Sequence, residues 1–172
     1  NLYRYHASDY SSQPHMENPM QALELKIPPP LVVLLVGTAM WIVAHARPLF
    51  EMSHSTRVFA FVAPALIGGA TAIAGEREFK RAKTTANPLK PQNASALVTS
   101  GVFRFTRNPM YLGLVFFLLG WAAYLCSAWA LAGPVIFVLY ISRFQIAPEE
   151  RILSGLFGTA YADYRSRVRR WL

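Results

Sequence analysis

The sequence predicts an all-α, multi-pass integral membrane protein with about four to five transmembrane helices. Hydrophobic residues make up 53% of the 172 residues, and the mean hydropathy is +0.26, which is more apolar than an average soluble domain of this size. Four long apolar segments follow one another along the chain, and Arg and Lys residues gather beside them. Together these observations indicate helices that cross a bilayer.

The four apolar segments each have nearly the length of a transmembrane helix. An α-helix rises about 1.5 Å per residue, so a hydrocarbon core of about 30 Å needs about 20 residues. The segments are slightly shorter, and we expect their flanks to extend them. They cover residues 31–46, 58–74, 111–124 and 129–146. Small residues that allow membrane helices to approach closely occur in them at Gly68, Gly69, Gly113, Gly120 and Gly133.

Positive charge is concentrated on one side of the predicted membrane. Seven of the 17 Arg and Lys residues lie in 77–107, and six lie in 143–170. With four spans these stretches share one side, and the positive-inside tendency predicts that it faces the cytoplasm, at the cell membrane if the source is prokaryotic. We therefore attribute the formal net charge of +8 to basic residues that flank the transmembrane segments. Because no basic platform interleaved with aromatic residues is present, we predict no nucleic acid partner.

One membrane-embedded domain is expected over residues 16–172. Residues 1–15 are polar, aromatic and without periodicity, and we expect a vector-derived or disordered segment there. The single cysteine, Cys126, and four histidines without ligand spacing predict neither a disulfide framework nor a metal site. The sequence makes no prediction about the oligomeric state.

The connection between the second and third apolar segments, residues 75–110, is expected to carry function. At about 35 residues it is much longer than an ordinary helix connection, and long ordered loops usually carry functional residues. Pro88 and Pro91 require extended backbone in its middle. It ends in "RNPMY", where polar residues and a proline lie at the edge of an apolar segment. The simplest interpretation of this motif is a helix start.

After the fourth apolar segment the sequence predicts an interfacial amphipathic helix. Pro148 suits a first helical turn, and Glu149 and Glu150 are favourable near a helix N-terminus. Apolar residues then recur at helical spacing, and Trp171 is expected at the level of the lipid headgroups. Two acids beside a membrane boundary are costly unless they have partners. The partner is either a ligand or, in a purely structural interpretation, Arg143.

Two motifs in this order resemble the isoprenylcysteine carboxyl methyltransferase family, which belongs with the membrane-embedded phospholipid methyltransferases. The first is "LVTSGVFRFTRNPMYLG" (97–113) and the second "EERILSGLFGTAYADYRSRV" (149–168). The family's second motif matches at Glu149, Glu150, Leu153, Phe157, Gly158, Tyr161 and Tyr164. The resemblance covers about residues 75–170, so 75–172 is expected to carry the catalytic motifs. It implies methyl transfer from S-adenosyl-L-methionine to a lipophilic or membrane-partitioned acceptor, either a carboxylate or a phospholipid amine.

The resemblance also implies roles for individual residues. The family's cofactor contacts fall on Ser95, Ala96, Leu97, Val98, Phe103, Asn108, Pro109, Met110, Tyr111 and Glu149. Catalytic positions fall on Gln145 and Glu150, and Arg143 is a candidate to serve in place of the arginine that is missing at position 145, although two residues along a helix is a different face.

Three positions depart from the prenylcysteine enzymes. Asn108 replaces a histidine, as in phospholipid N-methyltransferases, and Phe103 replaces a tyrosine. Gln145 stands where an arginine is thought to hold the substrate carboxylate, and glutamine cannot supply that charge. The acceptor therefore stays open among carboxylates, amines, phospholipids and small hydrophobic molecules. A second class of function, a non-catalytic membrane scaffold or transporter with the same fold, is the alternative hypothesis.

Overall fold

All four apolar segments form helices in the computed structural model, which describes residues 23–46, 51–85 and 87–172. The expected terminal segment, residues 1–15, lies outside these ranges. No strand occurs in the described ranges, so the all-α prediction is confirmed. The elements are α1 (Pro29–Ala46), α2 (His54–Arg81), the 3₁₀ turns η2 (Pro91–Asn93) and η3 (Gly101–Arg104), α3 (Pro109–Leu125), the 3₁₀ turn η4 (Ala128–Leu131), α4 (Ala132–Ile141), the π-helical turn η5 (Ser142–Ile146) and α5 (Ala147–Arg167).

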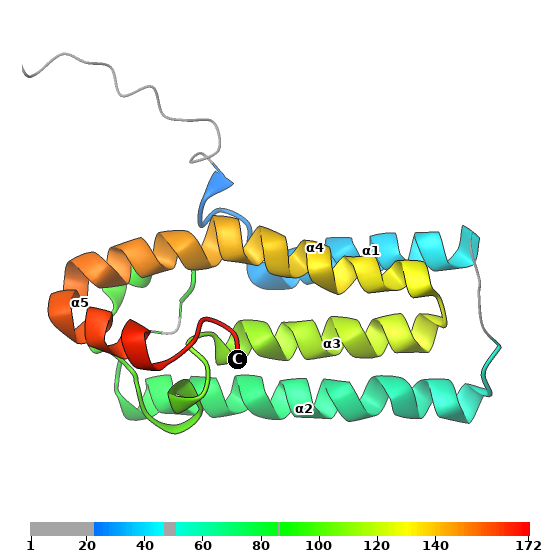
Figure 1. The fold of residues 1–172 in the computed structure, drawn as a ribbon, viewed down its shortest axis with the longest axis horizontal. Helices are drawn as coiled ribbons and strands as arrows, with labels where there is room; N and C mark the ends of the chain where they lie inside the picture. Colours follow the sequence, from blue (N-terminus) through cyan, green and yellow to red (C-terminus); the bar gives the residue numbers. More distant parts are fainter. Residues whose placement is uncertain (1–22, 47–50, 86) are drawn as a thin grey trace, which may run out of the picture.

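The apolar helices form an elongated bundle in which α3 lies between α2 and the α1–α4 pair (Figure 1). Among the described residues, three helical stretches are long and apolar enough to cross a membrane: α1, α2 and the continuous run Ala128–Arg167. Helix α3 is apolar but has 17 residues. Large apolar side chains remain exposed on the outer faces, as lipid contact requires, and Phe59, Leu66 and Leu139 are examples.

Helices α2 and α3 cross at two glycines. A Cβ atom at Gly113 would lie 2.5 Å from the carbonyl oxygen of Gly68, and a Cβ atom at Gly68 would collide with the carbonyl oxygen of Gly113. The predicted close approach is confirmed at this crossing because each glycine leaves room for the backbone of the other. Gly69 differs, since a Cβ there would meet nothing within 4 Å.

Pro148 lies in the first turn of α5, as predicted, but α5 continues from α4 and η5 in one unbroken helical run. Pro148 has no N–H and therefore cannot bond the carbonyl of Phe144, four residues earlier. That carbonyl accepts a hydrogen bond from the backbone N–H of Leu25 at 3.0 Å. The π-helical turn η5 precedes the proline, in keeping with the way such turns accommodate irregular residues within helices. The helix therefore passes Pro148 without ending.

Helix α5 bends sharply near its middle and leads the chain back toward the bundle (Figure 1). The bend is at Gly158, whose φ of 50° is a conformation that glycine adopts without steric cost. We call residues 168–172, which follow the helix, the return segment. Its Trp171 packs against the core, and the indole N–H donates to the Ser142 hydroxyl at 3.3 Å. Trp171 therefore packs against the bundle, and its expected position at the level of the lipid headgroups stays a prediction.

Candidate functional site

A cavity lies where the long loop, the start of α3 and helix α5 meet. The space within its lining, including the open mouth, is about 840 Å³. Its wall is mostly apolar, with a few charged side chains. Nine of the ten residues assigned to the cofactor line it, all except Ser95: Ala96, Leu97, Val98, Phe103, Asn108, Pro109, Met110, Tyr111 and Glu149. Asn108 and Glu149, distant in sequence, thus share one hollow.

The loop wall is held in place by hydrogen bonds from behind. The Thr84 hydroxyl accepts from the backbone N–H groups of Ser95 and Ala96, at 2.9 and 3.3 Å. The Ser95 hydroxyl donates to the carbonyl of Lys83 at 3.4 Å. Ser95 is therefore turned to the end of α2, and its neighbour Ala96 lines the cavity instead.

A buried acid fixes the turn that precedes α3. Glu78 is 8% exposed and accepts hydrogen bonds from the Ser100 hydroxyl and, at 2.7 Å, from Arg81. Gly101, which follows Ser100, has a φ of 56°, and a Cβ atom there would lie 2.6 Å from the carboxyl carbon of Glu78. Sequence reasoning missed Glu78, which is one of several charged residues between positions 76 and 83.

A cluster of apolar and aromatic side chains ties this turn to α5. Phe103 is 5% exposed and packs with Val98, Tyr161 and Tyr164. The Tyr164 hydroxyl donates to the carbonyl of Phe103 at 2.8 Å. The second sequence motif thus holds the first one against the cavity.

The motif "RNPMY" both starts α3 and supplies cavity wall. Pro109 occupies the first helical turn, where a missing N–H costs nothing. The Asn108 side-chain amide donates to the backbone carbonyl of Arg170 at 2.8 Å. The Tyr111 hydroxyl donates to Glu149 Oε1 at 2.7 Å. The helix-start interpretation is therefore correct, and the same residues also face α5.

Glu149 is the acid at the centre of the cavity wall. It accepts from the hydroxyl of Tyr111 and from the Gln145 amide at 3.2 Å, and both bonds fall on Oε1. Gln145 is 2% exposed, and its amide also donates to the carbonyl of Pro88 at 2.6 Å. Gln145 thus lies behind Glu149 as a support and does not line the cavity. Oxygen Oε2 of the partly exposed Glu149 side chain accepts no hydrogen bond from residues 23–46, 51–85 and 87–172.

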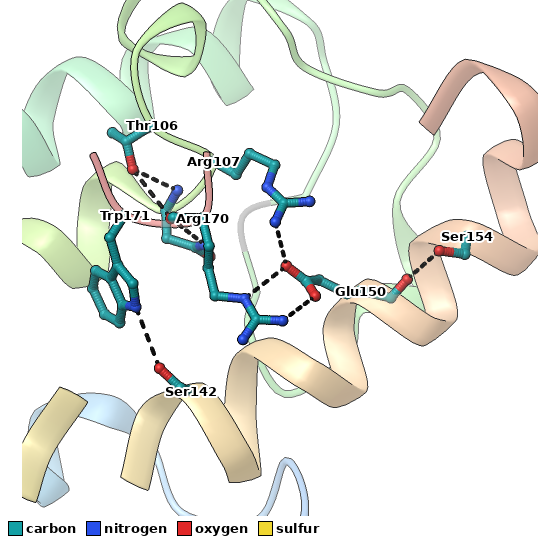
Figure 2. Close-up of polar contacts among 8 residues, drawn as sticks. Thr106, Arg107, Ser142, Glu150, Ser154, Arg170 and Trp171 are labelled. Carbon is teal, nitrogen blue, oxygen red and sulfur yellow. Dashed lines mark hydrogen bonds and ion pairs between the residues drawn. The ribbon is translucent and has the colours of Figure 1, made fainter. Parts of the chain in front are cut away.

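Glu150 joins two arginines from distant parts of the chain (Figure 2). Arg107 Nη2 lies 3.0 Å from Glu150 Oε1. Arg170 of the return segment donates to the same carboxylate from Nε at 3.1 Å and from Nη2 at 2.6 Å. The hydrogen bonds from Arg170 to Glu150 raise the pKa of Arg170 above its ordinary value. Sequence reasoning singled out neither arginine as a site residue, although Arg107 opens the quoted "RNPMY".

Arg143 is not brought to the cavity. It pairs with Glu24, which precedes α1, at 2.7 Å, and Arg151 binds the same carboxylate. Burial opposes the ionisation of Glu24, but the hydrogen bonds and charges of the two arginines outweigh it and lower the pKa of Glu24. The suggested structural ion pair between Arg143 and Glu149 is therefore wrong. Arg143 of η5 and Arg151 of α5 instead attach these two elements to the chain before α1.

The chain matches the sequence pattern of the family described as "Phospholipid methyltransferase" over residues 56–160. An uncharacterized protein of Haemophilus influenzae is 48% identical over 63 residues, which are 37% of this chain and all of that protein. Protein-S-isoprenylcysteine O-methyltransferase of Mus musculus is 37% identical over 75 residues, 42% of this chain and 25% of that enzyme. Methanethiol S-methyltransferase 1 of Bradyrhizobium diazoefficiens is 40% identical over 67 residues, 39% of this chain and 22% of that enzyme. The chain thus spans about a quarter of these two enzymes, and no solved structure matches it.

Proposed function

Because the chain belongs to the phospholipid methyltransferase family, we propose that it is an integral membrane methyltransferase that uses S-adenosyl-L-methionine. When bound, this cofactor supplies an electrophilic methyl group on its sulfonium sulfur, which an acceptor takes by in-line displacement. The observation that carries the proposal is the meeting of both sequence motifs in one cavity, with Glu149 beside Asn108 and Tyr111.

The residues of the cavity fit such a cofactor. Oε2 of Glu149 can accept hydrogen bonds from ribose hydroxyls or from an ammonium group, and the bonds from Tyr111 and Gln145 hold the carboxylate in place. The faces of Tyr111 and Tyr161 in the wall can attract a sulfonium cation. Backbone groups of residues 96–98 supply donors and acceptors for the adenine. Fixing the reacting groups in this way would lower the barrier by alignment.

The acceptor is proposed to be lipophilic, because the cavity wall is mostly apolar and lies at the end of a bundle with exposed apolar faces. An isoprenylcysteine carboxylate and a phospholipid amine are the two main classes. The Gln145 side chain is buried and does not line the cavity, so it supplies no contact to an acceptor there. We propose that the cavity opens on the cytoplasmic side, since the basic stretches 77–107 and 143–170 surround it.

The proposal predicts methyl transfer to lipid. The protein is reconstituted in nanodiscs with methyl-labelled S-adenosylmethionine and a lipid extract that contains prenylated cysteine. Label should enter the organic phase and decrease strongly for Glu149→Gln but not for Asp163→Asn, an exposed acid on the same helix. Alkaline hydrolysis separates the acceptor classes because it releases a methyl ester as methanol and leaves an N-methyl group intact.

Two results would contradict this proposal in different ways. If the folded protein shows no saturable binding of S-adenosylmethionine at millimolar concentration, S-adenosylmethionine is excluded as its cofactor. Saturable binding without transfer to any lipophilic acceptor would leave the non-catalytic scaffold or transporter as the better description.

A further inference from the structure

Arg107 is a buried cation whose hydrogen-bonding capacity is only partly used. Its side chain is 10% exposed and lines the cavity. Nη2 contacts Glu150, whereas Nε and Nη1 are buried and have no hydrogen-bond partner in the described part of the chain. A guanidinium carries donors on all three nitrogens, and leaving buried charged donors without partners is expensive. Such a group in a cavity wall is expected to be satisfied by a ligand.

The ion pair with Glu150 does not fully explain Arg107. The Glu150 carboxylate already receives two hydrogen bonds from Arg170, one on each oxygen (Figure 2). One acid is therefore shared between two guanidinium groups. The Arg170 side chain is 38% exposed and reaches solvent, whereas the Arg107 side chain is 10% exposed, so Arg107 carries the positive charge that water screens least. Such a buried charge favours an anionic partner.

Glu149 presents the opposite imbalance. No cationic side chain pairs with it among residues 23–46, 51–85 and 87–172, and its hydrogen bonds come from a tyrosine and a glutamine. Glu149 and Arg107 both line the same cavity. The cavity thus offers one acid without a cation and one guanidinium with free donors, an arrangement that suits a ligand carrying both charges.

Resting on the proposed function, we propose that Arg107 binds the α-carboxylate of the methionyl group of the cofactor, while Glu149 receives its cationic or hydroxyl groups. A guanidinium matches a carboxylate in geometry and charge, and such hydrogen bonds are stronger than neutral ones. The inference gives Arg107 a specificity role: it distinguishes a nucleoside with an amino-acid end from one without.

The test compares two nucleosides that differ only at that end. S-adenosylhomocysteine carries the amino acid, whereas 5′-methylthioadenosine keeps the adenosine and the thioether and lacks it. Calorimetry on the full chain in detergent should show that Arg107→Gln weakens the binding of S-adenosylhomocysteine by about tenfold or more. The affinity for 5′-methylthioadenosine should stay within about twofold of the wild-type value. Arg104→Gln is the matched control, because Arg104 is an exposed arginine three positions earlier and does not line the cavity. It should change neither affinity.

Arg107→Gln is expected to fold, since Arg170 still compensates Glu150. If Arg107→Gln fails to fold, Arg107→Lys replaces it in the test, because lysine keeps a charge beside Glu150 without the planar guanidinium. Arg107→Lys should weaken the binding of S-adenosylhomocysteine but not that of 5′-methylthioadenosine. Equal affinities of wild type and variant for S-adenosylhomocysteine, or equal losses for both nucleosides in a folded variant, would overturn the inference. Unchanged cofactor binding with lost methyl transfer would also overturn it and would assign Arg107 to the acceptor. Wild-type protein that binds neither nucleoside would refute the proposed function itself.

Discussion

Replacing Glu149 by glutamine should weaken the binding of S-adenosylhomocysteine by about ten- to a hundredfold. A hydrogen bond to a charged group contributes about 1.5–3 kcal/mol, and each 1.4 kcal/mol corresponds to a factor of ten in affinity. Glutamine keeps the size of the side chain and an acceptor oxygen for Tyr111, so the fold should be retained. Calorimetry on detergent-solubilised protein measures the difference directly.

Asp163→Asn provides the control for this substitution. It removes the same charge from the same helix α5, but Asp163 is exposed and does not line the cavity. Its affinity for S-adenosylhomocysteine should equal that of the wild type. Identical affinities of Glu149→Gln and wild type would exclude Glu149 from the cofactor site. A loss shared by both variants would indicate a general charge effect instead.

Replacing Gly113 by alanine should destabilise the bundle by about 1–3 kcal/mol, the usual cost of overpacking. The new methyl group would meet the backbone carbonyl of Gly68, which belongs to the neighbouring helix and cannot rotate away as a side chain can. Helices α2 and α3 would have to separate, and the start of α3 carries the cavity wall. Thermal unfolding in detergent, followed by circular dichroism, should show a clearly lower midpoint.

Gly69→Ala is the matched substitution for that experiment. It adds a methyl group on α2 next to Gly68, the residue that contacts Gly113, but at a position where a Cβ atom would meet nothing within 4 Å. Its unfolding midpoint should equal or exceed that of the wild type, because alanine has the higher helix propensity. If Gly113→Ala were as stable as Gly69→Ala, the close crossing of the two helices would be wrong.

Local patterns predicted the apolar helices well because membrane burial makes every residue of a span apolar. The expected segment 31–46 became Pro29–Ala46, and 111–124 became Pro109–Leu125. The continuity of α5 with α4 was not predictable in this way. The carbonyl of Phe144, which Pro148 leaves without its helical donor, is satisfied by the backbone N–H of Leu25, a residue far away in the sequence.

In the candidate site, too, the features set by local sequence were predicted and those set by long-range contacts were missed. The cavity wall follows the two motifs, since each motif starts or occupies a helix with a fixed face. The environment of Glu150 was missed because it depends on the bend at Gly158, which brings Arg170 back to the start of α3. Arg143 was misplaced because its partner, Glu24, lies before the first helix and shows no sequence pattern.

The central claim is that residues 96–111 and 146–164 together form one nucleoside-binding cavity. Hydrogen–deuterium exchange of the protein in nanodiscs, with and without saturating S-adenosylhomocysteine, tests it most directly. Slower exchange should appear in peptides from both stretches, while peptides from α1 should be unaffected. Protection confined to one stretch, or found only among the transmembrane helices, would show that these two parts of the chain do not share a ligand.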